Sequence, residues 1–523
     1  MHHCRRNECN ECDHGGMKRR HFLRSAVAVG SSSILGCNAC GDGAAGPVAA
    51  SKKDPVGPAP DLELTLRAAQ REVSLFPGTP TSTWSFSADL ALGSVDALKA
   101  VDASYLGPTL RLRRGQRVRV HLENHLSEPT VVHWHGLDVD QNNDGHPRFA
   151  VPAGGEATYD FEVSNRAGTY WYHPHPMDRT ALQVYSGLAG LLIVSDDEEQ
   201  RLSLPDGTRE LLLVIQDRTF DGDNQFVYAP DRMLGFLGTD ILVNGRRAET
   251  LEVPAGPHRL RILNGSNSRF YDLGWSDGTP LTVLGTDGGL LAAPRERAHV
   301  LLAPGQRLDL WASFGGGPGE DVWLESRAFS GVGSAMGMRG MGRRSGAQPG
   351  LPNGAPLQIQ RFVATAKGAQ GRPPPALADA ADLVVGAAPA SPSHRVDVSM
   401  RMMRWLLNGR SFEMLGVAEN ERVKLGAVED WVFVNDGGGM MAMAHPIHMH
   451  GSPFTIVDRT SASDALHEGI FDEGLQDTFI LLPGDSVRIR TRRARYPGLF
   501  LYHCHNLEHE DMGMMRNYLV EDA

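Results

Sequence analysis

The stretch LFLYHCHNLEHEDMGMM, residues 499–515, crowds three histidines, one cysteine and three methionines into one short run. It opens with apolar and aromatic residues, which favour a β-strand. Side chains alternate between the two faces of a strand, so the sulfur of Cys504 would face one way while His503 and His505 face the other. The stretch therefore predicts one strand that serves two metal sites.

Histidine pairs of the same kind occur elsewhere in the chain. Residues two apart on a strand point to the same face, so each pair would present two imidazoles in one direction. A single pair is often accidental, but four pairs together indicate metal binding. Imidazole suits zinc, copper, iron and nickel, so the pairs alone do not identify the metal. The pairs are His133 and His135, His173 and His175, His448 and His450, and His503 and His505.

The cysteine narrows the choice of metal. Cys504, His509 and the isolated His445 can form a trigonal site, with a methionine as a weak fourth ligand. That ligand set is typical of a blue-copper electron-transfer site. Zinc would require a closed tetrahedral set and would leave the other imidazoles unexplained.

Short segments with alternating apolar residues recur along the chain, as in residues 62–66, 117–120 and 487–490. Turn signals such as Pro304-Gly305 and Pro483-Gly484 separate them. No long helical periodicity is present. The pattern predicts an all-β protein built from β-sandwiches.

Two parts of the sequence repeat one order of motifs. HWHG (133–136), a Pro-Gly turn, a strand and GTYWYHPHP (168–176) are matched by HPIHMHG (445–451), a turn, a strand and GLFLYHCHN (498–506). A part with strand patterning but no such pairs lies between them, followed by a proline-rich linker. We expect three sandwiches, at 58–200, 201–366 and 396–523, with a linker at 367–395 and a signal and tether at 1–57.

Charge and cysteine usage restrict partners and location. The 523 residues carry a net charge of −11, which disfavours nucleic acid and anionic membranes as partners. Five of the six cysteines lie within the first 40 residues, so no disulfide framework is expected in the body.

Arg19 and Arg20 before a short apolar run resemble a twin-arginine export signal, which predicts the periplasm or cell envelope. Cys37 follows a sequence that resembles a lipoprotein cleavage site, so the signal is either cleaved there to leave a lipid anchor on Cys37 or is an ordinary cleaved signal. Translation starts at either Met1 or Met17.

HWHG, HPH, HPIHMHG and HCHNLEHEDMGMM resemble the four copper-binding motifs of the three-domain multicopper oxidases, of the bacterial laccase-like or cuprous oxidase type. The resemblance covers roughly residues 60–521, with the motifs in order. It implies three consecutive cupredoxin-like Greek-key β-sandwich domains and four copper ions. It also implies one-electron oxidation of a donor at a type 1 copper, coupled to reduction of dioxygen to water at a trinuclear cluster.

The resemblance also implies which residue holds which copper. Met514 is assigned because the axial ligand of the family lies five residues after the last histidine, and Met515 is assigned to the core. The type 1 copper takes His445, Cys504, His509 and Met514; the type 2 copper takes His133 and His448; one type 3 copper takes His135, His173 and His505, and the other takes His175, His450 and His503.

Three residues are predicted to serve catalysis beyond holding copper. Cys504 is covalently continuous with His503 and His505, which gives electrons a bonded route to the cluster. Asp144 and Glu510 match family positions for acids that are hydrogen-bonded to the cluster and supply protons. Alternatively, Asp144 is a turn residue and Glu510 a solvated one. Asp477 matches a family acid near the type 1 histidines.

Methionine-rich segments bear on the substrate. Thioethers are soft ligands that favour Cu(I). The alternative is a glycine-rich loop whose methionines are incidental, and Met441 stands where the cuprous oxidases have an aspartate. The candidate Cu(I) ligands are Met336, Met338 and Met341 in GSAMGMRGMG, and Met441 and Met443 in MMAM.

The predicted function is therefore that of an exported, monomeric multicopper oxidase. Its partners would be dioxygen and either a small phenolic or aromatic donor or Cu(I). The alternatives are a cuprous oxidase dedicated to copper tolerance, a strict laccase or bilirubin-oxidase-like enzyme, and a copper-free structural relative of the same fold, like the cell-division protein that shares it.

Overall fold

The computed structural model describes residues 57–522 apart from 316–320, 334–349, 384, 388, 390–393, 438–441 and 462–465. The predicted export signal with Cys37 lies outside the described residues, as do Met336, Met338, Met341 and Met441. Within the described part, no helix is both long and apolar enough to cross a membrane.

The first sandwich comprises β1 Leu62–Val73, β2 Thr81–Leu92, β3 Leu98–Lys99, β4 Thr109–Arg113, β5 Arg117–Asn124, β6 Val132–His135, β7 Glu156–Glu162, β8 Gly168–Pro174 and β9 Gly190–Ser195. They form sheets of order β2-β1-β5-β7 and β3-β4-β9-β8-β6. Leu64 of β1, Leu110 of β4 and Leu192 of β9 belong to one buried core, so the two sheets pack face to face.

The second sandwich comprises β10 Glu210–Arg218, β11 Asp240–Val243, β12 Arg246–Arg247, β13 Thr250–Val253, β14 Gly256–Asn264, β15 Tyr271–Trp275, β16 Leu281–Thr286, β17 Gly289–Arg297, β18 Val300–Leu302, β19 Arg307–Phe314, β20 Asp321–Ser326 and β21 Leu357–Ala364. The sheets have the orders β12-β11-β10-β14-β19-β16-β17 and β13-β21-β20-β15-β18. Leu260 and Leu324 share its core.

The third sandwich comprises β22 His394–Arg401, β23 Arg404–Leu407, β24 Arg422–Lys424, β25 Val428–Val434, β26 His445–Met449, β27 Phe454–Thr460, β28 Thr478–Leu481, β29 Ser486–Arg492, β30 Gly498–Cys504 and β31 Met515–Glu521. The sheets have the orders β23-β22-β25-β29-β27 and β24-β31-β30-β26-β28. The core of this sandwich contains Cys504 and Met514.

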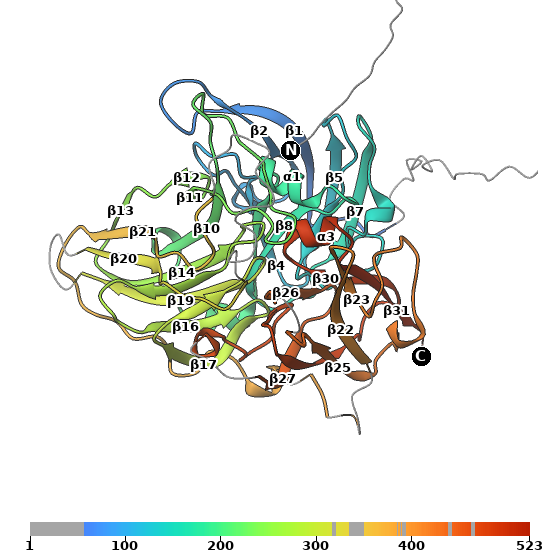
Figure 1. Ribbon diagram of the computed structural model, residues 1–523. Coiled ribbons are helices and arrows are strands. Elements are labelled where there is room, and N and C mark those ends of the chain that lie inside the picture. The colour runs from blue at the N-terminus through green and yellow to red at the C-terminus, as the bar shows by residue number, and fades with distance from the viewer. Residues whose placement is uncertain are drawn as a thin grey trace, which may run out of the picture. The chain divides into compact units, whose positions relative to one another are not determined.

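The same strand pairings recur in all three sandwiches. β1 pairs in parallel with β5, β10 with β14, and β22 with β25. In the opposite sheets, β4 pairs in parallel with β9, β13 with β21, and β24 with β31. Parallel neighbours require a crossing connection, as in Greek-key sandwiches. The predicted fold class is therefore confirmed, and Figure 1 shows the three sandwiches in blue to cyan, green to yellow and orange to red. The exact domain boundaries stay predictions.

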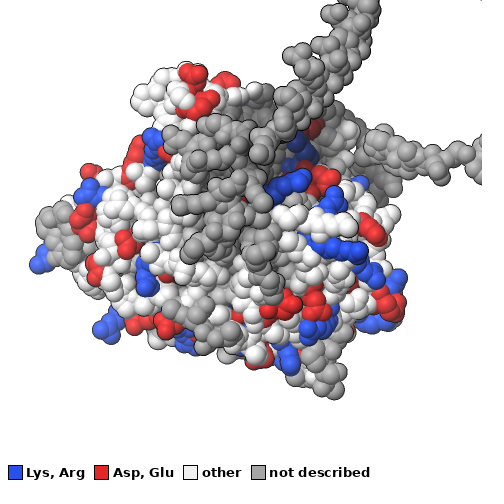
Figure 2. All heavy atoms as spheres, viewed as in Figure 1, with Lys and Arg blue, Asp and Glu red and all other residues white. Residues whose placement is uncertain are grey.

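Strand patterning also explains the core. Leu62, Leu64 and Leu66 of β1 are buried while the residues between them are partly exposed, as the period of two predicts. Helices are short: α1 spans Thr180–Ser186, α2 Asp197–Arg201 and α3 Leu507–Asp511. Acidic and basic side chains are interspersed over the surface seen in Figure 2.

Candidate metal centre

Strand register brings the histidine pairs together. β6 runs antiparallel to β8 with His133 opposite His173, and β26 runs antiparallel to β30 with His448 opposite His503. All eight histidines of the four pairs are buried. Two antiparallel strand pairs, one from the first sandwich and one from the third, therefore form a single imidazole cluster.

The two sandwiches interdigitate through ring stacking. The ring of His133 stacks on that of His450, and the ring of His135 stacks on that of His448, each with centroids 3.8 Å apart. Each stack joins one histidine from the first sandwich to one from the third. Neither sandwich alone can build the cluster.

Several ring nitrogens of the cluster face one another at hydrogen-bond distance, with too few protons to satisfy every contact. Nε2 of His503 lies 3.3 Å from Nε2 of His175 and 3.2 Å from Nε2 of His450. One N–H can point to only one of these neighbours, so at least one of the two contacts is repulsive. A cation bound between the three nitrogens removes that repulsion. These three histidines form a metal-competent group.

The remaining cluster histidines form two more groupings. Nε2 of His133 lies 3.4 Å from Nε2 of His448, and Nδ1 of His135 lies 3.4 Å from Nε2 of His173. His505 lies beside the second pair, with its ring centroid 5.0 Å from that of His135. Both ring nitrogens of His505 are buried without a hydrogen-bond partner in the described structure, which is costly unless a metal is bound.

A separate group lies on the other face of β30. The sulfur of Cys504 is 3.5 Å from Nδ1 of His445 and 3.7 Å from Nδ1 of His509. Met514 is buried in the same core, and its backbone N–H donates to the carbonyl of His509 at 2.9 Å. Burial raises the pKa of the Cys504 thiol, so a cation is needed to hold its thiolate. The structure thus brings together the residues predicted for a His2Cys site.

Helix α3 places His509 beside Cys504. The side chain of Asn506 accepts the backbone N–H of His509 at the start of α3. One turn of helix therefore separates Cys504 from His509, and their side chains meet on one side. The sequence analysis did not predict this helix.

Two residues that the sequence analysis missed cover this second group. The ring of Trp405 lies 4.5 Å from that of His445 and 5.5 Å from that of His509. Nε2 of His509 donates to the backbone carbonyl of Met233 at 2.7 Å. Met233 belongs to a loop, residues 231–235, in which Asp231 accepts backbone N–H groups of Met233 and Leu234 at 2.7 and 2.9 Å. Neither residue belongs to a recognisable motif.

Asp144 contacts two cluster histidines. Its backbone carbonyl accepts Nδ1–H of His133 at 2.6 Å, and its carboxylate accepts Nδ1–H of His450 at 2.7 Å. Burial raises the pKa of Asp144 well above its ordinary value. The reading of Asp144 as a mere turn residue does not account for these contacts.

Glu510 also lies at the cluster. Its carboxylate oxygens are 3.1 Å from Nδ1 of His503 and 3.5 Å from Nε2 of His175. Burial alone would raise the pKa of Glu510, but the two histidines lower it to about 2. The side chain is buried rather than solvated.

The prediction that Asp477 lies near the type 1 histidines is wrong. Its carboxylate accepts Nε2–H of His135 at 3.0 Å, and its backbone carbonyl accepts Nδ1–H of His448 at 2.8 Å. The reason is strand register: β28 pairs with β26 so that Thr478 lies opposite His448 and Leu481 lies opposite His445. Asp477 therefore lies at the cluster end of the strand.

Met443 is the one candidate Cu(I) ligand among the described residues. It is buried in the third core and forms an isolated β-bridge with Gly333. Its thioether is therefore not presented to solvent.

Comparison with known proteins identifies the family. Two sequence profiles, both described as multicopper oxidase, match residues 87–199 and 388–523. The solved McoA multicopper oxidase of Aquifex aeolicus is 30% identical with a TM-score of 0.75, and the match covers 88% of this chain and 97% of that one. The chain belongs to the multicopper oxidase family. It is therefore an oxidase that couples oxidation of a reducing substrate to reduction of dioxygen.

Two further relatives of this multicopper oxidase differ in the activity that their names state. A laccase of Bacillus stratosphericus is 29% identical over 499 residues, which covers 84% of this chain and 90% of the laccase. A solved multicopper oxidase of Campylobacter jejuni, described as a metallo-oxidase, is 25% identical with a TM-score of 0.71, covering 88% of this chain and 91% of that one.

Copper is the cofactor that the family implies, and the donors fit it. The thiol and two imidazoles on one face of β30 suit a blue-copper site, and the cluster offers imidazole nitrogens, which copper also binds. Burial lowers the pKa of His173 to about 3 and that of His175 to about 4, so both are unprotonated at neutral pH and able to bind a metal.

Proposed function

We propose that this multicopper oxidase takes electrons singly from small phenolic or aromatic donors, and from Cu(I) as a second class of donor. The observation that carries the proposal is the shared strand β30. It presents Cys504 to the two histidines of the type 1 site and His503 to the histidine cluster. Bound copper would supply the redox chemistry, accepting single electrons at the first group and reducing dioxygen at the cluster.

We assign the ligands as the family motifs suggest. The facing nitrogen pairs and the orphaned nitrogens of His505 support this assignment. The type 1 copper would be held by His445, Cys504, His509 and Met514, the type 2 copper by His133 and His448, and the type 3 pair by His135, His173 and His505 together with His175, His450 and His503.

Three side chains would act in turnover. Cys504 is bonded through the backbone to His503 and His505, which provides the electron route between the two groups. Asp144 would hold a proton beside the cluster, and Glu510 would act there as an ionised proton acceptor, supported by their contacts with His450 and His503. A buried carboxyl with a raised pKa, as in Asp144, is a candidate proton carrier.

The proposal includes both donor classes because two relatives of the chain differ in the activity that their names state. Trp405 and the backbone of Met233 cover the type 1 histidines, so a donor would deliver electrons through this cover rather than by touching an imidazole. The laccase relative supports organic donors, and the metallo-oxidase relative supports a metal donor. Met336, Met338, Met341, Met441 and Met443 stay candidates for Cu(I) delivery.

Cellular context rests on sequence alone. The twin arginines Arg19 and Arg20 support export to the periplasm or cell envelope, with Cys37 as the residue of a lipid anchor. An exported oxidase of Cu(I) would serve copper homeostasis. We propose a monomer.

The test is a spectrum of the purified, copper-loaded protein. We expect an intense blue absorption that is lost in Cys504→Ser, and oxygen consumption with a phenol that is lost in the same variant. A wild-type protein with four bound coppers but no blue absorption would refute the ligand assignment. Rates with Cu(I) and with a phenol, measured with and without residues 333–342, then separate a dedicated cuprous oxidase from a strict laccase. A copper-free relative would bind no copper under any condition.

A further inference from the structure

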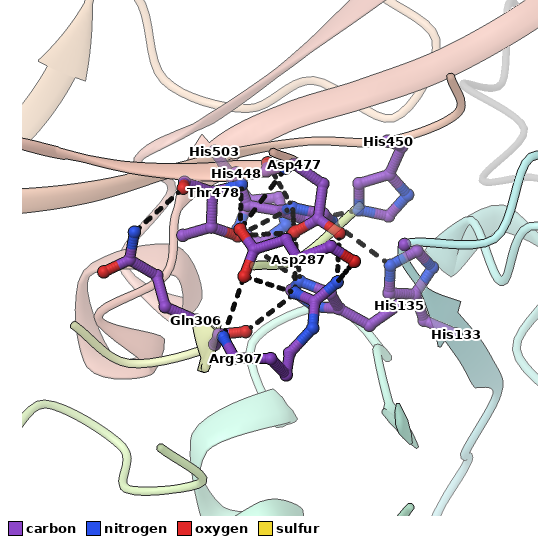
Figure 3. Close-up of polar contacts among 12 residues, drawn as sticks. His133, His135, Asp287, Gln306, Arg307, His448, His450, Asp477, Thr478 and His503 are labelled. Carbon is purple, nitrogen blue, oxygen red and sulfur yellow. Dashed lines mark hydrogen bonds and ion pairs between the residues drawn. The ribbon is translucent and has the colours of Figure 1, made fainter. Parts of the chain in front are cut away.

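Three buried charged side chains meet beside the histidine cluster. Asp287 lies between β16 and β17, Arg307 is the first residue of β19, and Asp477 precedes β28. All three are buried. Figure 3 shows Arg307 and Asp287 grouped with Asp477 beside His135 and His448.

Arg307 fixes the carboxylate of Asp477 with two hydrogen bonds. Its Nη1 donates to Oδ1 of Asp477 at 2.8 Å, and its Nη2 donates to Oδ2. The same guanidinium is tied to backbone in the first sandwich, where Nε donates to the carbonyl of Thr169 at 2.9 Å, and in the second, where Nη1 donates to Gly305 at 2.9 Å. A planar guanidinium held at so many points allows the carboxylate one orientation.

Asp287 fixes the backbone that carries Asp477. One carboxylate oxygen accepts the backbone N–H of Arg307 at 2.8 Å. The other accepts the backbone N–H groups of Asp477 and Thr478 at 3.3 and 3.2 Å. The second sandwich therefore holds both the side chain and the main chain of this segment.

The segment in turn holds two cluster histidines. Oδ1 of Asp477 accepts Nε2–H of His135 at 3.0 Å, and the backbone carbonyl of Asp477 accepts Nδ1–H of His448 at 2.8 Å. The hydroxyl of Thr478 donates to Oδ1 of Asp477 at 2.9 Å and lies 3.1 Å from Nδ1 of His448. One contact orients a ring from the first sandwich, and the other orients a ring from the third.

A purely structural ion pair between sandwiches is the competing explanation. Burying such a pair costs desolvation free energy, and apolar residues often stabilise as well or better. Arg259 shows such a pair in the same sheet: its guanidinium donates to Asp309 at 2.9 Å, and neither side chain hydrogen-bonds to a cluster histidine among the described residues. Arg307 differs because its carboxylate partner, Asp477, accepts a hydrogen bond from the imidazole of His135.

We propose that Arg307 and Asp287 are positioning residues for the copper cluster. They act on the type 2 copper through His448 and on one type 3 copper through His135. Through Asp477, the second sandwich sets the orientation of His448 and His135, although it supplies none of the proposed ligands. The inference rests on the ligand assignment proposed above. Partners that orient metal-bound histidines typically change metal affinity about 10- to 100-fold when removed.

Arg307→Lys tests the proposal, because lysine keeps the charge but offers a single point donor instead of a fork. Arg259→Lys is the matched control. We expect Arg307→Lys to lose copper from the cluster at roughly 10-fold lower chelator concentration than the wild type, and its type 2 electron paramagnetic resonance signal to change. The type 1 blue absorption should remain, and Arg259→Lys should match the wild type in all three readouts.

Two results would overturn the proposal. One is an Arg307→Lys protein whose type 2 signal and copper retention equal those of Arg259→Lys. The other is an equal loss of both copper signals, which indicates general destabilisation. If Arg307→Lys does not fold, Asp287→Asn decides by the same criteria. Absence of blue absorption in the wild type would instead refute the ligand assignment, so the two failures are distinguishable.

Discussion

Asp144 and Asp477 hold the histidine cluster from two sides with the same pair of contacts. Each accepts a ring N–H of a histidine from its own sandwich at its backbone carbonyl and one from the other sandwich at its carboxylate: His133 and His450 for Asp144, and His448 and His135 for Asp477. The internal repeat therefore extends beyond the histidines to the residues that orient them.

The two aspartates differ in their charge partners. Burial alone would raise the pKa of Asp477, but Arg307 holds it below its ordinary value. Asp144 is buried, its pKa is raised, and its Oδ1 has no hydrogen-bond partner in the described part of the chain. Environments that push two carboxyl pKa values apart separate their roles. Asp477 is suited to be a fixed anion, and Asp144 to carry a proton.

Asp144→Asn should slow oxygen reduction without disturbing the type 1 site. The amide oxygen can still accept the N–H of His450, so the ring stays oriented while the titratable proton is lost. We expect turnover to fall roughly 100-fold, in the range of a removed acid–base group, with the blue absorption unchanged. Asp138→Asn is the control, since that carboxylate accepts the hydroxyl of Ser452 at 3.1 Å. Equal turnover in the two variants would remove the role of Asp144.

Glu510→Gln should alter the pH dependence of oxygen reduction. The carboxylate beside His503 and His175 is ionised far below neutral pH, so the neutral amide removes a permanent negative charge from the cluster. We expect turnover to fall at least about 10-fold, with a changed pH–rate profile. Reduction of the type 1 site by a phenol under anaerobic conditions should keep its rate. A profile identical to that of the wild type would contradict the prediction.

Local pattern predicted much of this molecule. Alternation of side chains was enough to predict that Cys504 and His503 point to opposite faces of one strand, because both lie on β30. Contacts that depend on register between distant segments could not be read in this way: Arg307 meets Asp477 across 170 residues, and Met233 meets His509 across 276. Helix α3 was missed because five residues are too short for a helical period to appear.

The copper-free protein should lose stability in mild acid. Burial lowers the pKa of His173 to about 3, and those of His175 and His509 to about 4. In the unfolded chain the pKa of a histidine is about 6.5. Below that pH the unfolded state therefore binds more protons than the folded state, which lowers the free energy of unfolding. Each histidine then removes about 1.4 kcal/mol of unfolding free energy per pH unit down to about pH 4.

Thermal unfolding of the copper-free protein between pH 7 and pH 5 measures this loss. The melting temperature should fall as the pH is lowered, and copper-loaded protein should lose less because bound metal competes with protons for the same nitrogens. A melting temperature that is constant or rises toward pH 5 would show that these histidines are not held neutral.

Asp231→Ala should open the cover over the type 1 site. Asp231 is exposed, but its carboxylate fixes the loop through the N–H groups of Met233 and Leu234, and this loop places the Met233 carbonyl on His509. Without these bonds the edge of His509 becomes accessible, so we expect KM for a bulky phenol to fall several-fold and the type 1 potential to shift.

Asp221→Ala is a matched control for this variant. Asp221 is also exposed in a loop of the second sandwich, and its carboxylate accepts two backbone N–H groups, those of Asp223 and Gln225, at 2.9 and 2.8 Å. Both variants should lose similar stability, about 1 kcal/mol for each hydrogen bond. Only Asp231→Ala should change the KM and the potential, because only its loop contacts a proposed copper ligand. Equal kinetics in the two variants would mean that donors deliver electrons by another part of the surface.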